Sequence, residues 1–216
     1  MAKRKFDTCF FERYAQLTLE SLLGRKYEDL VNEDRPDLQM PDLSLGIEVT
    51  RAMEPRKDVA NDMLKEMAGF ELEGDDKEEM DQIIKSGYGY GLQDGKYIGH
   101  LEYDYWRLAQ PLKRIIESKV GKVASGFYGD FKEYGLYIFC KDQLSEEEVI
   151  LTMEYTSDLQ RNLDIRYSTM YLSLIDRLYV CSLTDVDRTR KKTTCTSYEI
   201  PRGMRRLLFM EALTED

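Results

Sequence analysis

The sequence predicts an α/β protein in which a mixed central sheet lies between helices. Helix-like and strand-like patterns follow one another in the order helix, hairpin, helices, strand, helix, strand, which is typical of this architecture. The chain has 216 residues, which is enough to form a stable core without a disulfide or a bound metal. No repeat or linker divides it, so we expect one domain over residues 1–216.

In the first half of the chain, the patterns predict a helix followed by a β-hairpin. Residues 10–23 carry apolar side chains at helical spacing, and Gly24 suits the position after a helix end. Pro36 disfavours helix at the preceding residue, so a short strand begins there and a turn leads to a longer apolar strand over 43–50. The remaining expectations for this half are exposed helices over 57–73 and 76–85, and a loop or irregular hairpin over 86–99.

In the second half, two helices have recognisable starts. Pro111 suits the first turn of a helix that runs to about Val123. Ser145 and Glu148 have the spacing of a capping box, so a helix follows Ser145. Apolar runs predict strands over 133–142, 177–184 and 196–201, and a closing helix begins at 202. The expected core covers roughly 8–51 and 105–184, with a helical and loop insertion at 57–104 and a C-terminal strand and helix over 195–214.

Composition excludes several classes of function. With 41 acidic and 31 basic residues the net charge is −10, which argues against a protein that coats nucleic acid without sequence preference. No apolar run is long enough for a signal peptide or a membrane span, so we expect a cytoplasmic protein without a membrane partner. The single histidine, His100, excludes zinc sites built on several imidazoles and has no nucleophile motif around it.

The cysteines give no sign of a metal site or a disulfide framework. None of the four shows CxxC spacing, and Cys140 and Cys181 lie inside apolar runs that are predicted to be strands. Buried free thiols are therefore expected at these two positions.

Two carboxylates of the predicted hairpin form the candidate site. Asp37 lies on the first arm and Glu48 on the second, so both can reach the same end of a sheet, and alternation places Glu48 and Thr50 on one face. Two carboxylates that converge repel each other unless a cation lies between them, and a hard divalent ion such as Mg²⁺ or Mn²⁺ suits oxygen ligands. Alternatively, Asp37 is a turn residue and Glu48 pairs with a base such as Arg51.

The same residues resemble a nuclease family. Pro36-Asp37, ten further residues and then Glu48-Val49-Thr50 at the end of an apolar strand look like the motif of the PD-(D/E)XK nucleases. The resemblance implies a restriction-endonuclease-like core, with the order of a helix, three strands, a helix and a strand. It also implies hydrolysis of phosphodiester bonds in nucleic acid, and many members of the family act as dimers, so a homodimer is a possible partner.

The resemblance also implies a ligand set for Mg²⁺ or Mn²⁺. Asp37 and Glu48 would hold the metal together with the backbone carbonyl of Val49. In the family a glutamate of the first helix often completes the site, and Glu12 fits this position best, with Glu20 second.

The sequence departs from the family at the position of the lysine. Thr50 stands there, and a hydroxyl cannot supply the positive charge that offsets the transferring phosphoryl group. Arg51 points to the other face of the strand, whereas Lys119 and Lys122 on the following helix could each bring a cation to the site. Some family members relocate the lysine in this way.

Two functions from different classes remain open. The first is a Mg²⁺-dependent nuclease that binds nucleic acid through a late basic cluster, formed by Arg188, Arg190, Lys191 and Lys192. The second is the same fold without catalysis, acting as a nucleic-acid or protein interaction module. A lysine nitrogen within about 4–6 Å of the Glu48 carboxylate would favour chemistry, because charges interact directly over that range.

Overall fold

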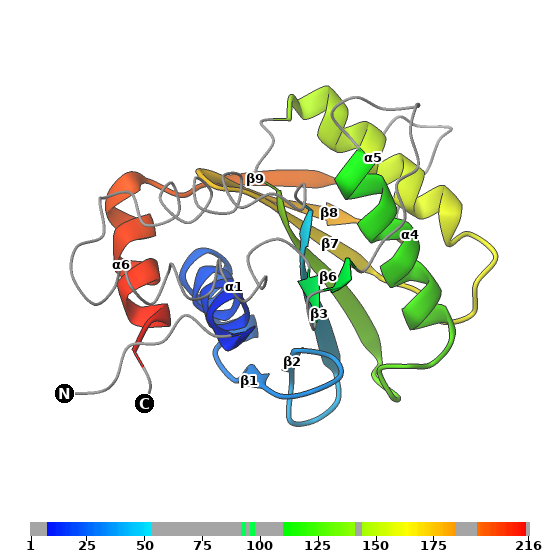
Figure 1. Cartoon of the computed structure of the whole chain (residues 1–216), viewed down its shortest axis with the longest axis horizontal. Coiled ribbons are helices and arrows are strands. Elements are labelled where there is room, and N and C mark those ends of the chain that lie inside the picture. Colours follow the sequence, from blue (N-terminus) through cyan, green and yellow to red (C-terminus); the bar gives the residue numbers. More distant parts are fainter. Residues whose placement is uncertain are drawn as a thin grey trace.

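The protein is an α/β structure with a mixed seven-stranded sheet between helices (Figure 1). The computed structural model describes residues 8–52, 92–93, 96–97, 110–140, 144–184 and 194–214. The strand order in the sheet is β1-β2-β3-β6-β7-β8-β9. The strands are β1 (Val31–Asn32), β2 (Leu38–Gln39), β3 (Leu45–Ala52), β6 (Glu133–Cys140), β7 (Thr169–Leu174), β8 (Arg177–Ser182) and β9 (Cys195–Glu199).

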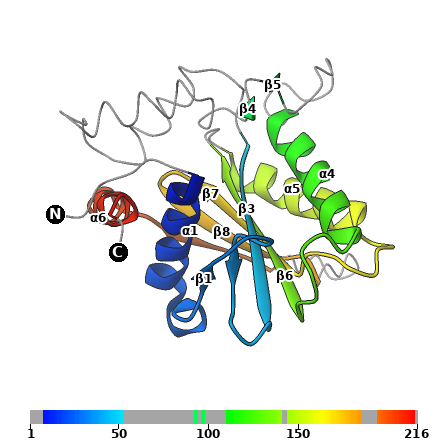
Figure 2. The same cartoon turned by 60° about the horizontal axis from the view of Figure 1, so that its bottom comes forward.

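Helices cover both faces of this sheet and create two apolar cores. Helices α1 (Thr8–Leu23) and α6 (Arg202–Ala212) lie on one face, and α4 (Gln110–Ala124) and α5 (Glu146–Leu159) lie on the other (Figures 1 and 2). The first core is rich in aromatic rings, with Phe10 against Phe209 at 5.1 Å between centroids. The second core contains the apolar side chains of α4 and α5, packed on the opposite side chains of β6 and β7. No helix in the part of the chain that the structure describes is both long and apolar enough to span a membrane.

The centre of the sheet is parallel and its edges are antiparallel. Strands β3, β6 and β7 run parallel to one another, and β2 pairs antiparallel with β3. In this register Leu38 lies opposite Ile47, so the residue before β2, Asp37, comes opposite Glu48. The local pairing of the hairpin therefore brings the two predicted carboxylates together.

Most predicted elements are present, with small shifts at their ends. Gly24 has a φ of +72° directly after α1, the left-handed conformation that glycine favours at the end of a helix. The capping box of Ser145 and Glu148 opens α5 as predicted. Short strands β4 (Leu92–Gln93) and β5 (Lys96–Tyr97) pair antiparallel, in agreement with an irregular hairpin, while the helices expected over 57–73 and 76–85 lie outside the described residues.

One central strand was not predicted. Strand β7 pairs parallel with β6, and a turn at Ile175-Asp176 joins it to β8. The segment predicted as the strand after α5 is β8, which is antiparallel to β7. Because neither glycine nor proline marks the turn, Asp176 is the only sign in the sequence pattern that two strands lie in this region.

Candidate functional site

The hairpin of β2 and β3 places Asp37 beside the backbone of Glu48 and Val49. The backbone N–H of Val49 donates a hydrogen bond of 2.6 Å to Oδ2 of Asp37. The N–H and C=O of one strand residue point to the same side, so the carbonyl of Val49 also faces the edge where Asp37 lies. Asp37, Glu48 and this carbonyl thus provide oxygen atoms at the end of the hairpin that could act as metal ligands.

The position of Asp37 depends on close packing of the preceding residue. Pro36 is buried, and a Cβ atom at Gly46 would lie only 2.7 Å from its Cγ atom and 3.0 Å from the ring of Phe131. Only glycine at position 46 lets the turn approach β3 this closely. The backbone N–H of Glu33 also donates to the carbonyl of Asp37 at 3.0 Å, which holds the turn from its other side.

A lysine from α4 meets the second carboxylate. Helix α4 crosses β3, and the Lys119 ammonium donates a short hydrogen bond to Oε1 of Glu48. The two side chains are 14% and 8% exposed, so this ion pair is largely shielded from water. Of the two lysines predicted as the displaced cation, the structure brings Lys119 to the site. Lys122 instead lies over the ring of Phe127, 5.2 Å from its centroid.

The raised pKa of Asp37 shows that the positive charge near it does not offset its burial and the neighbouring carboxylates. Burial, and then the negative charge of Glu48, raise the pKa of Asp37 to about 7, with a smaller contribution from Glu12 on α1. The hydrogen bond from Val49 and the charge of Lys119 act in the opposite direction but do not compensate. Strongly perturbed carboxyl groups of this kind are concentrated at functional sites.

The remaining predicted residues lie around this cluster or away from it. Thr50 is buried on the same face of β3 as Glu48 and supplies no charge. Arg51 is on the opposite face, with its guanidinium 4.6 Å from the centroid of the Phe11 ring. Burial lowers the pKa of Arg51 to about 10, and the charges of Glu12 and Asp37 oppose this shift, so Arg51 stays protonated at neutral pH. Glu20 accepts a hydrogen bond from Gln16 and takes no part in the cluster.

Two tyrosines extend the site, and no pattern in the sequence predicts them. Tyr128 follows α4 and is 2% exposed, and its hydroxyl lies near Glu48 and Tyr167 without forming a well-shaped hydrogen bond. The Tyr167 hydroxyl donates to the carbonyl of Lys119 at 3.2 Å, which supports the segment that carries the lysine. Burial and the charge of Glu48 raise the pKa of Tyr128, so its phenol stays protonated and can donate.

The donor set fits a divalent metal that keeps part of its shell for water or substrate. Within the described ranges, no group of three or more His, Cys, Asp or Glu side chains is close enough to bind a metal ion. The two carboxylates and one backbone carbonyl would supply only part of a shell, which is common for Mg²⁺ because it usually keeps several waters. The deficit of positive charge at Asp37 is the feature of this structure that a cation would relieve.

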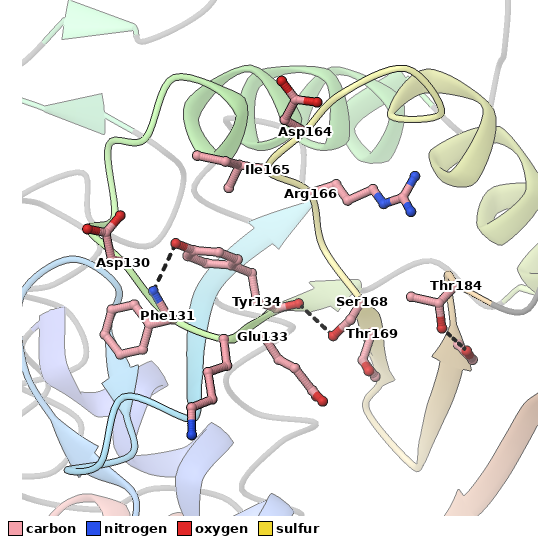
Figure 3. A pocket seen from close by; sticks show the side chains of 12 residues that line it. Asp130, Phe131, Glu133, Tyr134, Asp164, Ile165, Arg166, Ser168, Thr169 and Thr184 are labelled. Atoms are coloured by element: carbon pink, nitrogen blue, oxygen red, sulfur yellow. Dashed lines mark hydrogen bonds between the residues drawn. The ribbon is translucent and has the colours of Figure 1, made fainter.

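A second concave region lies at the other end of the parallel strands. It has a volume of about 530 Å³ and is lined mainly by polar residues from the starts of β6 and β7 and the end of β8 (Figure 3). Ser168 donates to the carbonyl of Tyr134 there, at 3.2 Å. This pocket shares no residue with the carboxylate cluster. The buried carboxyl group with a strongly raised pKa lies in the carboxylate cluster, which is therefore the stronger candidate.

Several predicted residues cannot be placed. The basic cluster of Arg188, Arg190, Lys191 and Lys192 lies outside the described residues, as does His100. No family model, curated protein or solved structure matches the chain. What the site can do follows from its own geometry and charge.

Proposed function

We propose that this protein is a nuclease that uses Mg²⁺ or Mn²⁺ to hydrolyse phosphodiester bonds of nucleic acid. The observation that carries the proposal is the position of Lys119, which pairs with Glu48 although it is 71 residues distant in the sequence. A lysine at this carboxylate restores the cation that the motif lacks at Thr50. It comes from a neighbouring helix, as the resemblance to the PD-(D/E)XK nucleases allows.

The order of elements around the site supports the restriction-endonuclease-like core. Helix α1 is followed by β2, β3 and β6, then by α5 and β7, and the last three strands in this series are parallel neighbours. With β1, β4 and β5 left aside, this order agrees with the helix, three strands, helix and strand that the resemblance implies, but the last strand is then β7 and not the predicted strand over 177–184. Helix α4 is an addition between β3 and β6, and it is the element that delivers Lys119.

Each side chain of the cluster has a chemical role under this proposal. Asp37 and Glu48, with the carbonyl of Val49, would hold the divalent ion, and Glu12 adds negative charge from α1. When bound, the ion supplies Lewis-acid polarisation of the phosphodiester and lowers the pKa of water. The Lys119 ammonium offsets negative charge on the phosphoryl group in the transition state, and its exclusion from bulk water strengthens that effect.

The test combines metal binding with cleavage. Calorimetric titration with Mn²⁺ on the wild type, Asp37→Asn and Glu48→Gln should show saturable binding only in the wild type. Lys119→Met should bind Mn²⁺ but lose cleavage of a mixture of single-stranded and double-stranded DNA and RNA, by about 100-fold or more, the effect of removing one charge-stabilising group.

Matched controls exist on the same elements. Lys122→Met removes a lysine from the same helix, and Asp42→Asn removes a fully exposed carboxylate from the same hairpin. Both should retain binding and cleavage. Loss of cleavage in Lys122→Met, or Mn²⁺ binding that survives both carboxylate substitutions, would contradict the assigned roles.

A second function, an interaction module without catalysis, is favoured by one observation. The Lys119–Glu48 ion pair already neutralises Glu48, so the fold can keep this carboxylate buried without a metal. Under this alternative the wild type binds no Mn²⁺ above the background of the two carboxylate variants, and no substrate is cleaved.

A further inference from the structure

Two cysteines face each other across the antiparallel pair of β8 and β9. The register places Cys181 directly opposite Cys195, and their Sγ atoms are 2.8 Å apart. This separation is short for a contact between two thiols, although it is longer than the covalent S–S bond of about 2.0 Å. Neither of these cysteines forms a disulfide in the structure, and neither does Cys140 in the second core.

The backbone at this pair already suits a covalent link. The adjacent pair, Ser182 and Thr194, is joined by a backbone hydrogen bond of 3.0 Å from N–H to C=O. Because hydrogen-bonded and non-hydrogen-bonded pairs alternate, Cys181 and Cys195 form a non-hydrogen-bonded pair, whose Cα atoms lie about 4.5 Å apart. A disulfide accepts Cα separations of about 4.4–6.8 Å, so the strands need no rearrangement to be bridged.

The two thiols differ in their access to reagents. Cys181 is fully buried, whereas Cys195 is half-buried at the edge of the sheet. The hydrogen bond with Cys181 lowers the pKa of the Cys195 thiol, which favours its thiolate. Of the two, only Cys195 is both accessible and favoured as the thiolate, which is the reactive form. Cys181 is close enough to attack a mixed disulfide that forms on Cys195.

We propose that Cys181 and Cys195 form a thiol–disulfide exchange site for a low-molecular-weight disulfide such as oxidised glutathione. The Cys195 thiolate attacks one sulfur of glutathione disulfide, which forms a mixed disulfide and releases one glutathione thiolate. Cys181 attacks the Cys195 sulfur, and its proton passes to the departing glutathione thiolate, which forms the protein disulfide and releases the second glutathione as a thiol. One dithiol and one disulfide thus give one protein disulfide and two molecules of glutathione.

The link would fix both ends of the segment between β8 and β9. That segment carries the four basic residues predicted to contact phosphate, and its two anchoring strands would become covalently joined. The proposal does not depend on the nuclease activity, because its two steps use only the two cysteines and glutathione.

Peptide mapping tests the proposal on the folded, full-length chain. Trypsin cuts between the two cysteines and separates peptides 178–188 and 193–202, so a disulfide joins them into one species that reduction splits. After treatment with oxidised glutathione and alkylation of the remaining thiols, we expect this linked pair as the main oxidised product. In denaturant, where strand pairing is lost, the same treatment should give a mixture of links among all four cysteines.

Two serine variants test the order of steps. Cys181→Ser should carry glutathione on peptide 193–202, because Cys195 then lacks a partner to displace it. Cys195→Ser should remain unmodified at position 181, because that thiol is buried. Alkylation of both Cys181 and Cys195 in the treated wild type, or a main link through Cys9 or Cys140, would overturn the proposal. Because the wild-type map alone decides this, the outcome does not depend on either variant folding.

Discussion

Asp37→Asn should stabilise the folded protein at neutral and higher pH. Burial and the nearby charge of Glu48 raise the pKa of Asp37 from 3.8 to about 7. At about 1.36 kcal/mol per unit, that shift corresponds to about 4 kcal/mol of unfavourable free energy when Asp37 is ionised in the folded state. Asparagine keeps an oxygen that accepts the bond from Val49, but its amide –NH2 group replaces an oxygen in a buried site and offsets about half of this, so we expect a net gain of about 2 kcal/mol.

The pH dependence gives the prediction its sign. A group whose pKa is raised on folding contributes stability below its unfolded pKa, and this contribution is lost as pH rises through the folded value. The advantage of Asp37→Asn should therefore be largest at about pH 8 and shrink towards about pH 5.5, where folded wild type takes up the proton. Urea denaturation of both proteins at these two pH values measures the free energies of unfolding.

Asp42→Asn is the matched control for this experiment. Hydrogen bonds from Ser44 lower the pKa of Asp42, so this carboxylate contributes stability above its unfolded pKa that is lost as pH falls. Its replacement should destabilise the protein slightly, which is the opposite sign. The reasoning would be refuted by an Asp37→Asn protein that is less stable than wild type at about pH 8, or by a gain that is independent of pH.

Three further predictions concern the same cluster. The affinity for Mn²⁺ should fall as pH is lowered below about 7, by up to tenfold per pH unit, because protons then compete for Asp37. Calorimetric titrations at several pH values measure this dependence, and a constant affinity would exclude Asp37 as a ligand. Gly46→Ala should lower the free energy of unfolding by about 1–3 kcal/mol in urea denaturation and also weaken Mn²⁺ binding, because the new methyl group would displace Pro36 and with it Asp37. Unchanged binding would show that this packing does not position the carboxylate. Tyr128→Phe should change the free energy of unfolding by less than about 0.5 kcal/mol, since its buried hydroxyl makes no well-formed hydrogen bond, whereas a loss of about 1 kcal/mol would indicate a bond to Glu48 or Tyr167.

The part of the site that the sequence could predict is the part that is local in the chain. Asp37 and Glu48 lie on two arms of one hairpin, so strand alternation and a short turn were enough to place them together. Helical spacing limited the displaced cation to Lys119 and Lys122. The choice between them depends on how α4 crosses β3, which is a tertiary contact that no periodicity encodes.

The missed features depend on contacts between distant segments. Tyr128 lies in a turn and Tyr167 in the irregular segment before β7, where no pattern restricts side-chain direction. Packing of α4 against α5 and the sheet brings both to Glu48. Strand β7 was missed for a different reason, because its apolar run leads into β8 through Ile175-Asp176, where a single aspartate is the only turn-favouring residue. A parallel neighbour for β6 is therefore visible only once the sheet is assembled.

The balance of charge around Asp37 explains why a phosphodiester and a divalent ion suit this site together. Three carboxylates, those of Glu12, Asp37 and Glu48, lie with two cations, Lys119 and Arg51, which leaves the cluster one positive charge short. In the metal-free protein, uptake of a proton by Asp37 near pH 7 meets this deficit. A divalent cation in place of that proton would instead leave one excess positive charge. A single phosphodiester group carries one negative charge, so it would restore neutrality. A buried site would therefore favour binding of the divalent ion together with the phosphodiester over binding of either one alone.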